Sequence, residues 1–178
     1  MKSHLKEILI DAPTIKAKVE EVGARLSEDY KDKNPIAICI LKGSVIFFAD
    51  LIREIKVPIE IDFLKASSYG KRTESSGKVE MAGDLSIDVQ GRSILLVEDI
   101  VDSGNTLKFF TEFFKEKGAA EVKICTLLDK PDRRTVDLTV DYTCFEIPDE
   151  FVVGYGLDYD QQFRNMPEIG VLKEEYYM

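Results

Sequence analysis

Strand-like and helix-like segments alternate along this chain of 178 residues, and that order limits the folds it can adopt. Strand patterns occupy 35–41, 58–67, 93–99 and 121–129, and shorter ones follow at 143–148 and 151–158. Helical spacing occurs at 45–55, at 106–119 (closed by Gly118) and after a possible cap at Asp11. Alternation of this kind predicts an α/β fold: a doubly wound, mostly parallel sheet flanked by helices.

Residues suited to a ligand site stand where the predicted strands end. They are Lys42 and Gly43, the stretch from Glu98 to Thr106, then Lys130 and Asp158. Ligands of open parallel sheets bind beyond the carboxyl ends of the strands. We therefore expect these segments to meet at one edge of the sheet.

Composition excludes several classes of function. The formal net charge of −9 argues against non-specific binding of nucleic acid, which needs a cationic face. The cysteines Cys39, Cys125 and Cys144 form no CxxC pair, so we expect buried free thiols in a reducing cytoplasm. His4 is the only histidine, which nearly excludes a Ser-His-Asp mechanism. No apolar run approaches membrane-spanning length, so no membrane partner is expected.

The stretch ILLVEDIVDSGNTL, residues 94–107, combines two kinds of ligand chemistry. Ser103 to Thr106 join a strand end to a helix start, where backbone N–H groups and hydroxyls can surround a phosphate. The spacing is not that of a Walker loop. Glu98 and Asp99 would repel that phosphate, but they suit neighbouring sugar hydroxyls or a magnesium ion. The pattern indicates a sugar phosphate with free hydroxyls.

VEDIVDSGNTL resembles the loop of type I phosphoribosyltransferases that binds 5-phosphoribosyl-1-pyrophosphate (PRPP). Other segments are similar to the hypoxanthine-guanine branch of that family, and together they span nearly the whole chain. These segments are LKGSVIFFADLIR (41–53), SSYG (67–70), LLDKP (127–131) and residues 149–172. The resemblance implies one domain, 1–178, with a core at about 35–150 and a small hood formed by 1–12 and 159–178. It also implies a mobile loop, 69–80, in which Ser68 and Tyr69 help to close the site.

The resemblance implies a reaction in purine salvage. A 6-oxopurine, hypoxanthine or guanine, attacks C1 of PRPP and gives IMP or GMP and pyrophosphate, with Mg²⁺ as cofactor. Asp102 would be the general acid/base at purine N7, and Glu98 and Asp99 would face the ribose hydroxyls. The other implied PRPP-binding residues are Lys42, Gly43, Ser103, Gly104, Asn105, Thr106 and Arg164.

The same resemblance implies how the base and the metal are held. Lys130, which only donates hydrogen bonds, would contact the purine O6. Phe151 would stack on the purine, and Ile100 would cover its other face. Main-chain carbonyls at Val152 and Asp158 would meet the 2-substituent.

Asp158 would also be the protein ligand of Mg²⁺, with Glu98 and Asp99 as further candidates. The Leu41-Lys42 peptide is expected to be cis, which would turn an amide toward pyrophosphate. Lys65 departs from the family pattern, because some family members have an arginine at this position that touches pyrophosphate. Lysine keeps the positive charge but lacks the planar fork of the guanidinium, which puts this contact with pyrophosphate in question. A homodimer or homotetramer is expected.

Other readings of these residues remain open. Glu98 and Asp99 could be a solvated strand end, Lys130 a surface lysine, and Phe151 core. Asp158 could simply end a strand, and Arg164 could form a surface ion pair. A regulator that senses PRPP and binds nucleic acid would be expected to add a basic surface or to lack Asp102. A receiver domain would not need SGNT, and phosphorylation by acetyl phosphate would identify it. The sequence does not specify the preference among hypoxanthine, guanine and xanthine.

Overall fold

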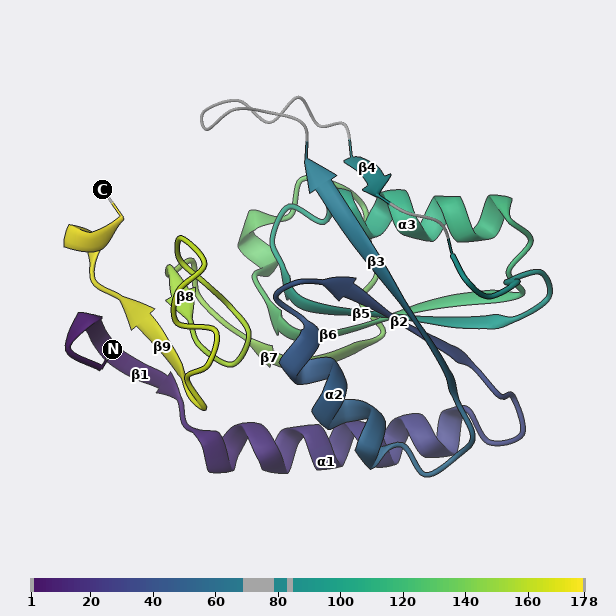
Figure 1. The fold of residues 1–178 in the computed structure, drawn as a ribbon, viewed down its shortest axis with the longest axis horizontal. Coiled ribbons are helices and arrows are strands. Elements are labelled where there is room, and N and C mark those ends of the chain that lie inside the picture. Colours follow the sequence, from purple (N-terminus) through teal and green to yellow (C-terminus); the bar gives the residue numbers. More distant parts are fainter. Residues whose placement is uncertain (1, 69–78, 83–84, 178) are drawn as a thin grey trace.

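A six-stranded sheet forms the centre of the molecule (Figure 1). The computed structural model describes residues 2–68, 79–82 and 85–177. The strand order is β4-β3-β2-β5-β6-β7, and β4 alone runs antiparallel to its neighbour. The strands are β2 (Ile36–Leu41), β3 (Glu60–Ser68), β4 (Val79–Ala82), β5 (Ser93–Val101), β6 (Glu121–Asp129) and β7 (Tyr142–Glu146). The predicted doubly wound, mostly parallel sheet is confirmed.

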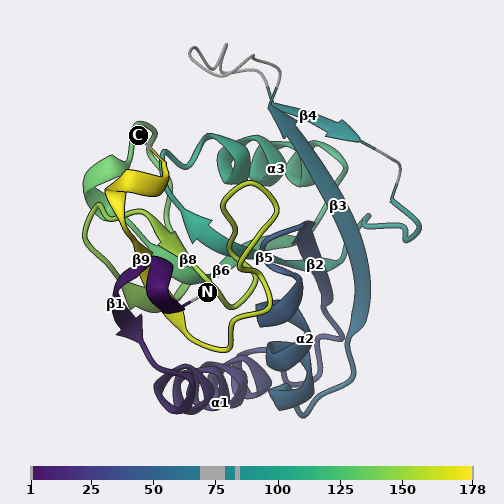
Figure 2. The same cartoon turned by 60° about the vertical axis from the view of Figure 1, so that its left-hand side comes forward.

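Helices cover both faces of this sheet (Figures 1 and 2). The first, α1 (Ala12–Asp29), and the second, α2 (Val45–Glu54), lie on one face, and α3 (Asn105–Glu116) lies on the other. Each face has its own apolar core: Leu26, Phe47 and Val97 belong to the first core, and Leu96 and Phe110 to the second. Neighbours in β5 thus point to opposite faces, and both are fully buried, which explains the continuous apolar run at this strand.

Local signals in the sequence account for the helix ends. The Asp11 carboxylate accepts a hydrogen bond from the Thr14 backbone N–H at 2.9 Å, so the predicted N-cap of α1 is confirmed. Gly118 has a φ of 83° directly after the cap of α3, in the left-handed region that favours glycine. The three cysteines are buried and free, as expected. None of the helices within the described ranges is long and apolar enough to cross a membrane.

The two ends of the chain form a second, three-stranded sheet (Figure 1). In it β1 (Leu5–Ile10) pairs antiparallel with β9 (Ile169–Leu172), which pairs with β8 (Val152–Val153). A small apolar cluster supports this sheet: Leu5, Val153, Phe163, Met166 and Leu172. The sheet and the loop before β9 therefore have a fixed position near the end of β5.

Two of the predicted element boundaries were wrong. The strand expected at 151–158 ends at Val153, because Gly154 and Gly156, at φ values of 102° and 103°, turn the chain. Val79 and Glu80, the last two residues of the loop expected at 69–80, belong instead to β4 and pair with β3. Residues 69–78, including Tyr69, lie outside the described residues.

Candidate active site

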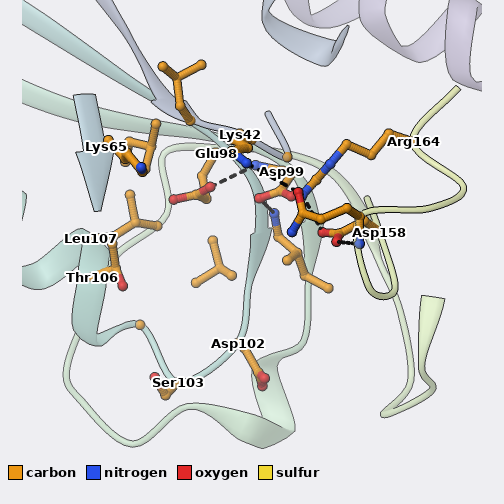
Figure 3. A pocket seen from close by; sticks show the side chains of 17 residues that line it. Lys42, Lys65, Glu98, Asp99, Asp102, Ser103, Thr106, Leu107, Asp158 and Arg164 are labelled. Atoms are coloured by element: carbon orange, nitrogen blue, oxygen red, sulfur yellow. Dashed lines mark hydrogen bonds and ion pairs between the residues drawn. The ribbon is translucent and has the colours of Figure 1, made fainter. Parts of the chain in front are cut away.

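A cavity of about 460 Å³ opens at the carboxyl ends of the parallel strands (Figure 3). Four segments line it: the turn after β2, Lys65 of β3, the end of β5 with the start of α3, and the loop that contains Asp158 and Arg164. The structure therefore brings together most of the ligand-site segments singled out from the sequence. Asn105 is not among the described residues that line it.

A second cavity, of about 520 Å³, adjoins the first. Asp99, Ile100, Asp102 and Asp158 line both. We call the first the phosphate compartment and the second the base compartment, after the ligand groups that the sequence resemblance implies for their residues. The base compartment also has Lys130, Arg133, Asp149, Glu150, Phe151, Val152, Leu157 and Tyr177 on its wall. Because Asp102 borders both spaces, its carboxylate can reach ligands in either one.

The loop between β5 and α3 has the geometry of an anion site. Gly104, the N-cap residue of α3, has a φ of 84°, which a residue with a side chain rarely adopts. The Ser103 hydroxyl accepts hydrogen bonds from the Asn105 side-chain amide at 3.1 Å and from its backbone N–H at 3.4 Å. The first turn of any α-helix leaves N–H groups without partners in the helix, and these favour an anion.

Two adjacent carboxyl groups lie deeper in the phosphate compartment (Figure 3). Glu98 is buried, and this burial, followed by the charge of Asp99, raises the pKa of Glu98 well above its ordinary value. A Cβ at Gly43 would lie 1.7 Å from Oδ2 of Asp99, so any side chain at this position would displace the Asp99 carboxylate from its place beside the turn after β2. The Leu41-Lys42 peptide is cis, which confirms the prediction.

The raised pKa of Glu98 predicts a stability effect. A carboxyl whose pKa is higher in the folded state adds stability below its unfolded pKa, and that stability is lost as pH rises through the folded pKa. Glu98→Gln removes the charge but keeps the shape. We expect it to raise Tm by at least about 2 °C at pH 8, with a smaller gain at pH 5.5.

Differential scanning calorimetry at the two pH values measures this. Glu112→Gln, an exposed position in the middle of α3, is the matched control and should leave Tm unchanged at both. A Glu98→Gln protein that melts below the unmodified chain at pH 8 would contradict the stated cause of the shift.

Cationic side chains surround these acids. Arg164 pairs with Asp158 at 2.7 Å and donates to the Gly156 carbonyl at 2.8 Å, and Lys42 donates to the Gln161 side chain at 3.2 Å. Figure 3 shows Arg164 and Asp158 on the same side of the cavity, across from Thr106. Lysine and arginine beside carboxylates suit a ligand that carries several phosphates together with a divalent metal.

The base compartment contains one buried cation and one exposed ring. Lys130 is 8% exposed, and its ammonium group donates to the Glu150 carbonyl at 2.8 Å. Phe151 is 37% exposed and stacks on Tyr177 with ring centroids 4.7 Å apart and an interplanar angle of 20°. A fully packed core role for Phe151 is therefore wrong. A flat aromatic wall with a donor at its edge suits a planar base with an acceptor on its rim.

The described residues contain no group of three or more histidine, cysteine or acidic side chains placed to hold a metal by themselves. Both oxygens of Asp158 are engaged, one by Arg164 and the other by the Gln161 backbone N–H at 2.8 Å. A metal at Asp158 would therefore share its carboxylate with these two partners or displace one of them.

Sequence reasoning missed several residues of the site, and three of them make contacts that matter here. Gln161 lines the phosphate compartment, and Arg133 and Tyr177 line the base compartment. Arg133 donates from Nε to Oδ1 of Asp102 at 2.8 Å. The only local signal for Arg133 is its place three residues after Lys130 in KPDRR, and no sequence pattern joins Tyr177 to Phe151.

Comparison with known proteins gives consistent results. A family model described as "Phosphoribosyl transferase domain" matches residues 6–160. Hypoxanthine-guanine phosphoribosyltransferases of Bacillus subtilis and Streptococcus pneumoniae are 50% and 51% identical to this chain over 177 residues, which are 99% of this chain and 98% of each relative.

Solved structures agree with these relatives. A crystal structure of a hypoxanthine phosphoribosyltransferase from Staphylococcus aureus has a TM-score of 0.96 and 44% identity, and the match covers 100% of this chain and 97% of that one. A ternary substrates complex of the Trypanosoma cruzi hypoxanthine phosphoribosyltransferase has a TM-score of 0.92 and 38% identity, over 99% and 100% of the two chains. The fold, the paired compartments and these full-length matches agree: the chain belongs to the phosphoribosyl transferase domain family.

Proposed function

We propose that this chain is a purine-salvage enzyme that transfers the 5-phosphoribosyl group of PRPP to hypoxanthine or guanine, and releases IMP or GMP and pyrophosphate. The observation that carries the proposal is the pair of adjoining compartments with Asp102 on the wall of both. One has the chemistry for a sugar carrying phosphates, and the other has the chemistry for a planar base. The names of the relatives from Bacillus subtilis and Streptococcus pneumoniae point to the same reaction.

In this proposal PRPP lies across the phosphate compartment. Its 5-phosphate accepts hydrogen bonds from the loop of Ser103, Gly104, Asn105 and Thr106, at the start of α3. Glu98 and Asp99 accept from the ribose hydroxyls. Lys42, Gly43 and Arg164 bind the pyrophosphate; all three line the phosphate compartment, and the position of Arg164 across from Thr106 supports this orientation.

The residues present fit a magnesium ion. Asp158 is the proposed ligand, with Glu98 and Asp99 as further candidates, and all three line the phosphate compartment. When bound, the ion neutralises charge on the pyrophosphate leaving group. In the ligand-free chain Arg164 neutralises Asp158, so we propose that Arg164 leaves Asp158 for the pyrophosphate when substrate binds.

The base is proposed to lie against Phe151, with Ile100 over its other face and the Val152 and Asp158 main chain near its 2-substituent. Lys130 donates to O6 and so prefers 6-oxopurines to adenine, whose 6-amino group is itself a donor. Asp102 exchanges a proton with N7 as charge shifts between the purine and the ribosyl centre. Its place between the compartments supports this role.

The reaction is tested by its products. Purified chain, PRPP, magnesium and hypoxanthine are incubated, and the mixture is separated by anion-exchange chromatography. We expect IMP and pyrophosphate in equal amounts, and neither product when PRPP or hypoxanthine is omitted. Hydrolysis of PRPP without formation of IMP would contradict the proposal.

We further propose a homodimer or homotetramer. Exposed apolar side chains on α2 and β3 support it: Val45, Ile46, Ile61 and Phe63, each 37–43% exposed. Phe63 packs edge-on against Phe48 of α2, so the two elements form one surface. Light scattering after size exclusion should give a mass of at least twice 20.2 kDa, and a monomer at micromolar concentration would contradict this.

A further inference from the structure

The turn after β6 contacts the β5–α3 loop at three successive positions. The Thr135 backbone N–H donates to the Ser103 carbonyl at 3.1 Å. The Arg134 stem packs so close to Gly104 that a Cβ there would lie 2.9 Å from its Cδ. Arg133 donates from Nε to Oδ1 of Asp102 at 2.8 Å. The segment that begins with Lys130 thus braces the proposed phosphate loop and the proposed proton carrier together.

Arg133 binds two acids at once. Its Nη1 donates to Oδ2 of Asp149 at 3.1 Å, and the other oxygen of Asp149 accepts from Lys130 at 3.4 Å. These hydrogen bonds to Asp149 and Asp102 raise the pKa of Arg133, and Arg133 in turn lowers the pKa of Asp149. A continuous chain of ion pairs, Asp102–Arg133–Asp149–Lys130, therefore runs along the wall of the base compartment.

Fold stability does not account for this arrangement. The side chains of Arg133 and Asp102 are 48% and 47% exposed, and ion pairs so open to water add little to folding stability. Their effect is geometric, because a guanidinium is a planar fork whose donors fix the direction of the acceptor. With Oδ1 bound to Arg133, the Asp102 carboxylate cannot rotate freely, and Oδ2 is left for a ligand.

We propose that Arg133 is a positioning residue, which holds the Asp102 carboxylate in the orientation needed for proton exchange with the purine. The inference rests on the proposed function, since it assigns Arg133 a role through Asp102. In this assignment Arg133 acts through Asp102 and not by contact with the reacting atoms. It also ties the position of Asp102, through Asp149, to Lys130, the residue proposed to recognise O6.

A double-mutant cycle tests whether Arg133 acts through Asp102. Arg133→Gln should lower kcat by about 10- to 100-fold, since small displacements of a reacting group cost that much. The KM for PRPP should stay within about twofold, because the phosphate loop keeps its Thr135 brace. In an Asp102→Asn background, Arg133→Gln should cause no further loss beyond about twofold. Arg133→Lys, which keeps the charge and can keep one hydrogen bond, should recover part of the lost kcat.

Arg92→Gln is the matched control, because Arg92 pairs with Glu60 at the opposite end of the parallel strands and lines neither compartment. It should leave kcat unchanged. Three results would overturn the inference: unchanged kcat in Arg133→Gln, a loss that resides in the KM for PRPP, or losses that multiply fully in the double mutant. If the unmodified chain forms no IMP, the proposed function fails first and this inference falls with it. If the unmodified chain forms IMP and Arg133→Gln forms it at the same rate, the proposed function stands and only the inference about Arg133 is overturned.

Discussion

Asp102→Asn should lower turnover by about 10²- to 10⁴-fold, the usual contribution of general acid–base catalysis, while PRPP binds nearly as before. Asparagine keeps the shape of the side chain and an oxygen that can accept from Arg133. The backbone amides of the neighbouring phosphate loop are unchanged. Only proton exchange with N7 is removed, so the loss should lie in kcat. Steady-state kinetics and isothermal titration with PRPP and magnesium measure the two quantities separately.

Glu98→Gln is the informative contrast to Asp102→Asn. Glu98 is buried beside Asp99, and its proposed role is to hold the ribose hydroxyls. Its replacement should weaken PRPP binding as well as rate. If Asp102→Asn retained full turnover, or if loss of PRPP binding were its main defect, the role assigned to Asp102 would be wrong.

Lys130→Met should lower kcat/KM for hypoxanthine by roughly 10- to 150-fold, the cost of losing about 1.5–3 kcal/mol in a hydrogen bond to a charged group. Methionine can fill the space of the lysine stem without offering a donor to O6. Because adenine does not use that donor, the preference for hypoxanthine over adenine should fall by a similar factor. Initial rates with both bases at saturating PRPP give these ratios.

Lys123→Met is the matched control for Lys130→Met. Lys123 lies on the same strand, β6, and pairs with Glu121 at 3.8 Å, away from both compartments. Its replacement should leave the hypoxanthine-to-adenine ratio unchanged. If Lys130→Met lowered kcat/KM equally for hypoxanthine and adenine, Lys130 would support the fold of the compartment and would not recognise O6.

The sequence was sufficient to predict the five parallel strands of the main sheet, because its signals there are local, but it did not predict the antiparallel β4. The run 94–97 is apolar on both faces of its strand, and Asp11 caps α1 with its own side chain. The two-residue strand β8 was not predictable, because FVVGYGLD has the composition of a longer strand. Its end depends on the backbone of Gly154, whose Cβ would lie 2.0 Å from the Glu168 carbonyl oxygen in a distant segment.

In the candidate site, too, the residues in one contiguous stretch were predicted, and those that depend on contacts between distant segments were missed. Glu98 to Thr106 are contiguous, so one stretch of sequence predicted both the acids and the anion loop. Arg133 and Tyr177 were missed because their contacts, with Asp102 and Phe151, join segments 26 or more positions apart and form only in the folded chain. An ion pair of Arg164 was among the readings of the sequence, but Asp158 was not predicted as its partner.

The central claim, that one site joins PRPP to a 6-oxopurine, is tested most directly by turnover with PRPP, magnesium and each of four purines, followed by ultraviolet absorbance. The account predicts conversion of hypoxanthine, guanine or both, with kcat/KM above that for adenine by about 10⁴ or more. Including xanthine gives the order of preference among the three 6-oxopurines, which the residues of the base compartment do not specify. Turnover of adenine at a comparable rate, or no turnover of either hypoxanthine or guanine, would contradict the account.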